Sequence, residues 1–232
     1  MLLIVNSMPK CGSTWFHNYV ARCLSLLSHP TAHQAAGHLV TLNDYANPGA
    51  LYRLNLERLL AAARSQTFAI KAHVPPNAEL LTALHAGEAR LVFLIRHPAN
   101  IVISALAYGE NRRLREDVTS PYYVFHQPKQ AAGFVAPWVD HAEAWLTAGS
   151  PAIIRRYEDL YASDSSIRAA IHVLWPETRS VSRAALAEMR PERLSPERRD
   201  HLRVNLRNYP GLTPEIASES AKWARRLGYG RN

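Results

Sequence analysis

The stretch from residue 2 to residue 27 constrains the fold more than any other part of the sequence. Residues 2–5 form a short apolar run, which is typical of a buried strand in a parallel sheet. Residues 6–15 contain proline, glycine and small hydroxyl side chains, a composition typical of a loop. Apolar side chains then recur with roughly helical spacing as far as Leu27. The stretch is therefore predicted to form a strand, a tight loop and a helix, as at the start of an α/β domain.

Such a loop is suited to binding an anion. Backbone N–H groups of the loop and the positive end of the helix dipole converge on one point. Lys10 adds a positive charge there, and Ser13 and Thr14 add hydroxyl donors. The loop is not a Walker A sequence, in which the lysine follows the second of two glycines, because here Lys10 precedes Gly12. The simplest alternative is that these residues only begin the helix.

A second short strand is predicted over residues 67–70, and it ends at Lys71 and His73. Ligands of open α/β sheets bind beyond the carboxyl ends of the strands, so we expect both side chains near Lys10. Because they are two residues apart on an extended segment, they project to the same side. His73 taken alone could also be an ordinary core or surface histidine.

The longest apolar run, residues 90–95, predicts the central strand, and a helix is expected over 99–108. P-loop NTPases often end the corresponding strand with an aspartate that holds Mg²⁺. Here the strand ends at Arg96, a side chain suited to bidentate phosphate recognition, which argues against metal-dependent nucleotide hydrolysis. The alternative is that Arg96 forms a surface salt bridge and that Ser104 packs within the helix.

The other elements follow from periodicity and from Gly, Pro and Asn punctuation. Together they predict one α/β domain over residues 1–232, with a central parallel sheet of about four to five strands flanked by helices. Long loops are expected over 29–51 and 109–130, and a fourth strand over 152–154. Helices are expected over 54–63, 78–86 (with Asn77 as the N-cap), 134–146, 167–174, 182–189, 196–206 and 214–227.

Composition limits the partners and the compartment. The net charge of +8 favours nucleic acid, an anionic membrane surface or a polyanionic cofactor. Cys11 and Cys23 do not form a disulfide pattern, so we expect a reduced, cytoplasmic protein, and no apolar run reaches membrane-spanning length. His29, His33 and His38 are candidate metal ligands, but no carboxylate or thiol lies between them, so no metal is expected.

Three segments, in this order, are similar to one family. Residues 9–15, PKCGSTW, resemble the 5′-phosphosulfate-binding loop of the sulfotransferases. Residues 71–75, KAHVP, resemble the segment that carries their catalytic base. Residues 96–104, RHPANIVIS, resemble their 3′-phosphate signature, with Asn100 in place of the common aspartate. From residue 7 to about 160 the chain thus resembles the cytosolic and bacterial small-molecule sulfotransferases.

This resemblance implies a three-layer, P-loop-like domain that uses 3′-phosphoadenosine 5′-phosphosulfate (PAPS), without a metal, to sulfate a hydroxyl of a small-molecule acceptor. It implies His73 as the base that takes the hydroxyl proton. Lys10 would stabilise the leaving phosphate oxygen, and Lys71 with the loop N–H groups the sulfuryl oxygens. Arg96 and Ser104 would hold the 3′-phosphate.

The resemblance also implies a full set of site residues. No Arg-Lys-Gly or Arg-Arg-Gly motif is present to close over the 3′-phosphate; in the arginine-rich segment 183–207, Arg198 and Arg199 are the nearest candidates and Arg203 is an alternative. Cys11, at a helix N-terminus beside Lys10, is expected to have a lowered pKa and to be reactive. The implied catalytic residues are His73, Lys10 and Lys71; the implied cofactor-binding residues are Lys10, Cys11, Gly12, Ser13, Thr14, Trp15, Arg96, Ser104, Tyr157, Arg198 and Arg199.

Three other functions are alternatives to sulfuryl transfer. A P-loop kinase would share the fold but needs Mg²⁺ ligands that the sequence does not offer. A nucleic-acid-binding module would rest on the arginine-rich segment 183–207, which is more typical of a solvated helix face. A protein that binds the nucleotide without turnover is disfavoured by His73 between Lys71 and Pro75. Oligomeric state has no readable signal in the sequence.

Overall fold

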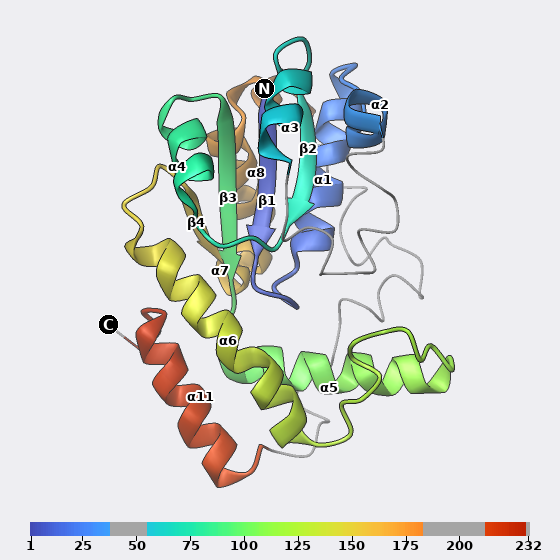
Figure 1. The fold of residues 1–232 in the computed structure, drawn as a ribbon, viewed down its shortest axis with the longest axis vertical. Helices are drawn as coiled ribbons and strands as arrows, with labels where there is room; N and C mark the ends of the chain where they lie inside the picture. The colour runs from blue at the N-terminus through green and yellow to red at the C-terminus, as the bar shows by residue number, and fades with distance from the viewer. Residues whose placement is uncertain (38–54, 183–211, 231–232) are drawn as a thin grey trace.

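A parallel β-sheet forms the centre of the protein in the computed structural model, which describes residues 1–37, 55–182 and 212–230 (Figure 1). Its four strands are all parallel and lie in the order β2-β1-β3-β4. This confirms the predicted α/β fold with a central parallel sheet. The strands are β1 (Leu2–Ser7), β2 (Phe68–Ala72), β3 (Ala89–Ile95) and β4 (Ile153–Arg156).

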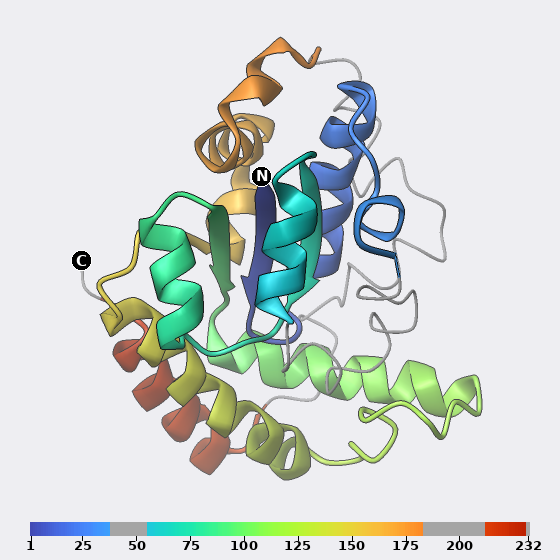
Figure 2. The same ribbon diagram turned by 45° about the horizontal axis from the view of Figure 1, so that its top comes forward.

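Helices connect and cover the strands. Figures 1 and 2 show α3 and α4 on one face of the sheet and α1 and α8 on the other, which gives three layers. Helices α5, α6 and α11 pack against one another beyond the carboxyl ends of the strands (Figure 1). The described helices are α1 (Ser13–Leu26), α2 (Ala32–Ala36), α3 (Leu56–Ala63), α4 (Ala78–His85), α5 (Pro98–Leu114), α6 (Pro128–Thr147), α7 (Tyr157–Ala162), α8 (Asp164–Leu174), the 3₁₀ helix η4 (Pro176–Ser180) and α11 (Pro214–Arg226).

The two central strands are buried because helices cover both of their faces. Every residue of β1 is buried, and Val5 lies level with Lys71 of β2 and Val92 of β3. A strand that is buried on both faces needs a continuous apolar run rather than alternation. That is why residues 2–5 and 90–95 were recognisable as strands in the sequence.

Local signals placed several helix ends correctly. Asn77 caps α4 by accepting a hydrogen bond from the N–H of Leu80 at 2.8 Å, as predicted. Asn55 caps α3 in the same way through the N–H of Arg58. The helices expected over 182–189 and 196–206 fall almost wholly outside the described residues. The interpretation of residues 1–232 as one domain stays a prediction.

The prediction that residues 109–130 form a loop was wrong at both ends. Helix α5 continues through Gly109 to Leu114, and α6 begins at Pro128. Gly109 therefore does not end the helix. It is instead the point where a later segment packs closely, because a Cβ there would lie 2.4 Å from the carbonyl oxygen of Tyr122. Proline at the first position of α6 suits a helix start, because its missing N–H would have no helical partner there.

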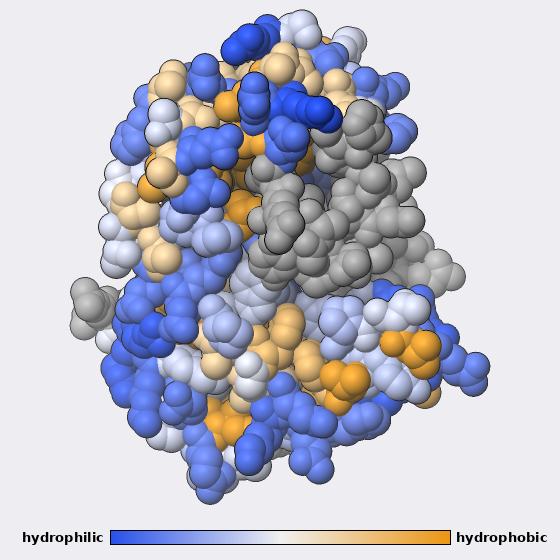
Figure 3. Space-filling model, in the orientation of Figure 1, coloured by the Kyte–Doolittle hydropathy of each residue, from blue (hydrophilic) through white to orange (hydrophobic). Residues whose placement is uncertain are grey.

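The face shown in Figure 3 is largely hydrophilic, with small separate apolar areas. The chain exposes the large apolar side chains of Leu114, at the end of α5, and of Val118 and Val124, which follow it. Within the part of the chain that the structure describes, no helix is long and apolar enough to cross a membrane.

Candidate active site

The predicted site residues meet at the carboxyl edge of the sheet. Strand β1 leads into the loop that carries Lys10, β2 ends at Lys71 and His73, and β3 is followed at once by Arg96. The order β2-β1-β3 makes these three strands neighbours. Parallel pairing puts their ends at one edge, so residues more than sixty positions apart in the sequence share one site.

The loop before α1 has the backbone expected of an anion cradle. Lys10 and Gly12 have φ angles of 62° and 76°, both in the left-handed region. For lysine this conformation costs free energy and is typical of functional sites. Helix α1 has no side-chain cap and no acidic residue in its first turn. Its positive end is therefore left for an external anion.

Lys71 is fixed against the first turn of α1. Its Nζ donates a hydrogen bond to Oγ1 of Thr14 at 2.9 Å, and this joins the end of β2 to the start of α1. The Thr14 hydroxyl accepts this bond, so its own hydrogen can still be donated to a ligand. Burial lowers the pKa of Lys71 to about 8.

Arg96 connects the loop with the end of β4. Its Nη1 donates to the carbonyl oxygen of Lys10 at 3.0 Å, and its guanidinium lies 4.2 Å from the ring centre of Tyr157. Its Nε is buried and has no hydrogen-bond partner among the described residues. A buried donor without a partner costs free energy, and a bound anion would supply the missing acceptor.

His73 is held in one tautomer and in the neutral form. Its Nδ1 lies 2.8 Å from the carbonyl oxygen of Ser7. Since a carbonyl can only accept, Nδ1 carries the hydrogen and Nε2 keeps a lone pair. Burial above all, together with the charge of Lys71, lowers the pKa of His73 to about 4. The side chain is thus a neutral base throughout the physiological pH range.

Two residues that the sequence analysis did not identify hold His73 in place. The side chain of Asn6 accepts from the N–H of Val74 at 3.0 Å and donates to its carbonyl oxygen at 2.8 Å. The indole N–H of Trp145 donates to the same carbonyl at 2.9 Å. The peptide that follows His73 is therefore clamped from β1 and from α6. No local pattern signals this contact, which joins segments about seventy residues apart.

Lys10 reaches across to α5. Its ammonium lies 3.7 Å from the ring centre of Tyr108 and 5.4 Å from that of Tyr122. Burial first, then the charges of Arg96, Arg112 and Lys71, lower the pKa of Lys10 to about 7. Neither tyrosine was a predicted site residue, although Tyr108 lies one helical turn after Ser104.

Several aromatic side chains of the segment 108–138 pack together rather than pointing into solvent. Tyr122 contacts the rings of Tyr108, Phe125 and Phe134, and Trp138 contacts both Phe134 and His73. A continuous aromatic cluster therefore runs from the lysine to the histidine of the candidate site.

Glu158 has a structural position. One carboxylate oxygen accepts from the backbone N–H of His97 at 3.0 Å, and the other accepts from the hydroxyl of Tyr229 at 2.9 Å. The end of the chain is thereby tied to the residues just after β3 and β4.

The expectation that the pKa of Cys11 is lowered was wrong. Its side chain is fully buried, and its Sγ lies 3.7 Å from the carbonyl oxygen of Pro9. Burial raises the pKa of the thiol well above its usual value, an effect larger than the opposing charge of Arg96. Helix position and a neighbouring lysine suggested a lowered pKa, but desolvation outweighs both. At this position only the backbone can face a ligand.

The other predicted cofactor-binding side chains are buried or fall outside the described residues. Trp15 is 4% exposed and stands edge-on to Tyr19, and Ser104 and Ser13 are buried. Arg198 and Arg199, with Arg203, lie outside the described residues. Roles for all of these in binding stay predictions.

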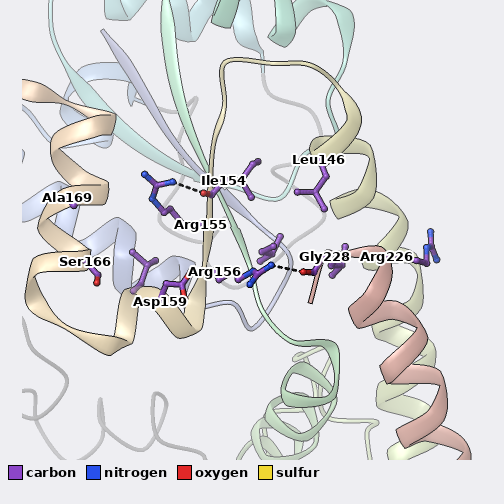
Figure 4. Close-up of a pocket in the computed structure, with 12 residues that line it drawn as sticks. Leu146, Ile154, Arg155, Arg156, Asp159, Ser166, Ala169, Arg226 and Gly228 are labelled. Atoms are coloured by element: carbon purple, nitrogen blue, oxygen red, sulfur yellow. Dashed lines mark hydrogen bonds between the residues drawn. The ribbon is translucent and has the colours of Figure 1, made fainter. Parts of the chain in front are cut away.

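A separate pocket of about 660 Å³ lies beside β4 (Figure 4). It is lined by side chains from β4, α7, α8 and α11, including Arg155, Asp159 and Arg226. Lys10, Lys71, His73, Arg96 and Ser104 do not line it. The candidate active-site residues therefore lie at the strand ends and not in this cavity.

The histidines of the first long loop do not form a metal site in the described chain. No group of three His, Cys, Asp or Glu side chains within it could hold a metal ion. His29 instead stands edge-on to Trp175 at a ring-centre distance of 4.9 Å. His38 lies outside the described residues.

The parallel sheet and the basic loop between its first strand and first helix define a P-loop-like α/β protein. Within that class the chain belongs to the sulfotransferase domain family, whose family model matches residues 2–164. It is an enzyme of this family, as the motifs predicted. No curated protein matches the chain.

Solved structures agree with this placement at the level of the fold. Mouse sulfotransferase SULT7A1, complexed with PAP, superposes with a TM-score of 0.60 at 14% sequence identity; the match covers 98% of this chain and 84% of that one. Retinol dehydratase, in complex with androsterone and the inactive cofactor PAP, gives a TM-score of 0.55 at 13% identity, with 97% and 80% covered. Both likenesses confirm the α/β fold.

Proposed function

We propose that this protein transfers a sulfuryl group from PAPS to a hydroxyl of a small-molecule acceptor. The observation that carries the proposal is the meeting of Lys10, Lys71, Arg96 and a neutral His73 at the ends of three adjacent strands. Three cations and the uncapped start of α1 suit a polyanionic donor, and the histidine suits proton removal from an acceptor. PAP in the two similar solved structures supports the choice of donor.

The residues present fit such a donor. Arg96 has a buried Nε in need of an acceptor, and its guanidinium lies on the Tyr157 ring. We assign the 3′-phosphate to Arg96 and Ser104, and the adenine to the neighbourhood of Tyr157. Lys10, with the backbone of residues 11–14, would receive the 5′-phosphosulfate.

Each side chain has a definite task in the transfer. PAPS supplies an activated sulfuryl group whose bond to the 5′-phosphate breaks during the reaction. Lys10 stabilises the negative charge that develops on the leaving phosphate oxygen, and Lys71 stabilises the sulfuryl oxygens. His73 accepts the acceptor's hydroxyl proton at Nε2, because Nδ1 already donates to Ser7.

The acceptor is proposed as a small alcohol or phenol. The aromatic cluster from Tyr108 to Trp138 lies between Lys10 and His73 and offers apolar surface beside the base. The free, buried thiols of Cys11 and Cys23 support a reducing, cytoplasmic location.

The test is isothermal titration of the protein with 3′-phosphoadenosine 5′-phosphate, compared with ADP and AMP, all in EDTA. We expect micromolar binding that depends on the 3′-phosphate. Arg96→Ala should weaken it about 10- to 100-fold, since a hydrogen bond to a charged group contributes about 1.5–3 kcal/mol. Arg90→Ala is the matched control: Arg90 lies near the other end of β3 and contacts Leu174.

Equal affinity for nucleotides with and without the 3′-phosphate would overturn the proposed donor. Equal losses in the Arg96 and Arg90 variants would overturn the assigned role of Arg96. Positive titrations would then justify a screen of acceptor alcohols and phenols by transfer of labelled sulfate.

A further inference from the structure

Two cations lie close to the ring of Tyr108. The Lys10 ammonium lies 3.7 Å from its centre, and the Arg112 guanidinium lies 4.4 Å from the same centre. Arg112 also donates a hydrogen bond from Nη2 to the Tyr108 hydroxyl. The contact between Lys10 and Tyr108 joins the anion loop to α5, and Arg112 holds Tyr108 from within the same helix. Of these three residues, the family motifs contain only Lys10.

The backbone and the side chain of Lys10 are fixed from different sides. Its carbonyl oxygen accepts the hydrogen bond from Arg96 at the end of β3. Its ammonium rests on the Tyr108 ring, with Tyr122 further off at 5.4 Å. A lysine side chain has many rotamers, so a ring that fixes its head selects one of them.

The charged groups that act on the pKa of Lys10 are Arg96, Arg112 and Lys71, and all three are cations. Arg112 is partly offset by Asp117, whose carboxylate accepts from it at 2.9 Å. Burial and these charges disfavour a protonated Lys10. The negative face of an aromatic ring acts in the opposite direction, because it attracts a cation but not a neutral amine.

We propose that Tyr108 is a positioning residue that holds the Lys10 ammonium at the anion loop and keeps it charged for catalysis. The proposal rests on the function proposed above in one respect: the charged Lys10 is useful because it faces the leaving phosphate. Tyr108 itself acts through Lys10. With a pKa of about 7, Lys10 is close to half-charged at neutral pH, so a modest contribution from the ring changes its charge substantially.

Competitive acetylation of the ligand-free protein tests the proposal without any assumption about activity. The full chain is treated with trace acetic anhydride from pH 5 to pH 11, and the modification of Lys10 is followed by mass spectrometry. Exposed Lys129 serves as the internal reference. The pH midpoint of Lys10 labelling reports its protonation.

We expect Tyr108→Phe, which keeps the ring, to give the midpoint of the natural protein. Tyr108→Leu should lower the midpoint by about 0.5 to 1 pH unit, the equivalent of one cation–π contact. Arg112→Gln should raise it, because a repelling charge is lost. An unchanged midpoint in a folded Tyr108→Leu protein would overturn the proposal.

A second variant keeps the test valid if Tyr108→Leu does not fold. Pentafluorophenylalanine at position 108 preserves the ring shape but reverses the charge on its face. We expect a lower Lys10 midpoint than with phenylalanine at the same position. Equal midpoints for the two rings would show that the ring acts by shape alone and would overturn the proposal.

The pH dependence of sulfuryl transfer separates this inference from the proposed function. In Tyr108→Leu, the alkaline limb of the kcat/KM profile should shift to lower pH by the same amount as the Lys10 labelling midpoint. In Tyr108→Phe, it should stay at the pH of the natural protein. Labelling shifts without any transfer activity would contradict the proposed function and leave the positioning role intact. Transfer activity with unshifted labelling would contradict the positioning role alone.

Discussion

His73 combines features that a general base needs and that its sequence context does not reveal. The Ser7 carbonyl fixes the tautomer. Burial lowers the pKa of His73 to about 4, so the ring is neutral at physiological pH. Asn6 and Trp145 hold the next peptide, so the imidazole cannot drift from the strand end. A base of low pKa is a weak proton acceptor, but it is fully available at neutral pH.

Replacing His73 by alanine should reduce kcat by about 100- to 10,000-fold, the usual contribution of a general base. Binding of 3′-phosphoadenosine 5′-phosphate should change less than about threefold, because His73 is not assigned to the nucleotide. Steady-state kinetics and titration calorimetry measure the two effects. His85→Ala, an exposed histidine at the end of α4, is the control and should leave both unchanged. Loss of nucleotide binding in a folded His73→Ala protein would contradict this division of roles.

At the scale of the element, α5 carries more of the site than its motif indicates. Ser104 and Tyr108 lie one turn apart on it, and Gly109 next to them lets the 122–125 turn pack against the helix. Arg113 secures that turn, donating from Nη1 to the carbonyl oxygens of Tyr123 at 3.0 Å and Phe125 at 2.8 Å. This turn places the ring of Tyr122 near the Lys10 ammonium.

Gly109→Ala tests this packing. A Cβ at position 109 would meet the Tyr122 carbonyl oxygen at 2.4 Å, so the turn must move, and the unfolding free energy should fall by about 1–3 kcal/mol. Chemical denaturation measures the loss.

Gly133→Ala in α6 is the matched helical control. Its Cβ would meet nothing within 4 Å, so alanine should stabilise the protein by about 0.5–1 kcal/mol through helix propensity. A neutral or stabilising Gly109→Ala would mean that the turn does not pack closely on α5.

At the scale of the whole molecule, the α/β fold places several histidines where protonation opposes folding. His73 and His141 both have a pKa of about 4, chiefly because of burial. His141 stacks on Phe93 and meets the ring of Trp138 at a tilt, and its charge would also repel a charged His73. In the unfolded chain both would titrate near 6.5.

The free energy of unfolding should therefore fall as the pH drops from about 6.5 to about 4. In that window the unfolded chain binds more protons than the folded one, and each histidine contributes about 1–3 kcal/mol. This stabilisation is fully present above pH 6.5. Denaturation at a series of pH values measures it.

The variant His141→Phe separates the contribution of one histidine to this pH dependence from that of the carboxylates, which also titrate in acid. It should flatten the pH dependence between pH 6.5 and pH 4, since phenylalanine can take the stacked position without a proton. A pH dependence as steep as that of the natural protein would show that burial of His141 does not destabilise its charged form.

The sequence alone determined the fold class, the positions of the four strands and the loop to which we assign donor binding. Those features are local: a strand buried on both faces needs a continuous apolar run, and a tight loop before a helix needs glycine and small polar residues. It also placed Lys10, Lys71, His73 and Arg96 at strand ends, where parallel topology puts ligands.

Only the tertiary structure decided which side chains meet at that edge. The order β2-β1-β3-β4 brings Ser7 to His73, and the packing of α5 brings Tyr108 to Lys10. Tertiary packing also buries Cys11, so desolvation overrides the helix dipole and the neighbouring lysine that suggested a lowered pKa for this thiol. Periodicity encodes which face of an element is buried, but the partner on that face is chosen by contacts between segments far apart in the chain.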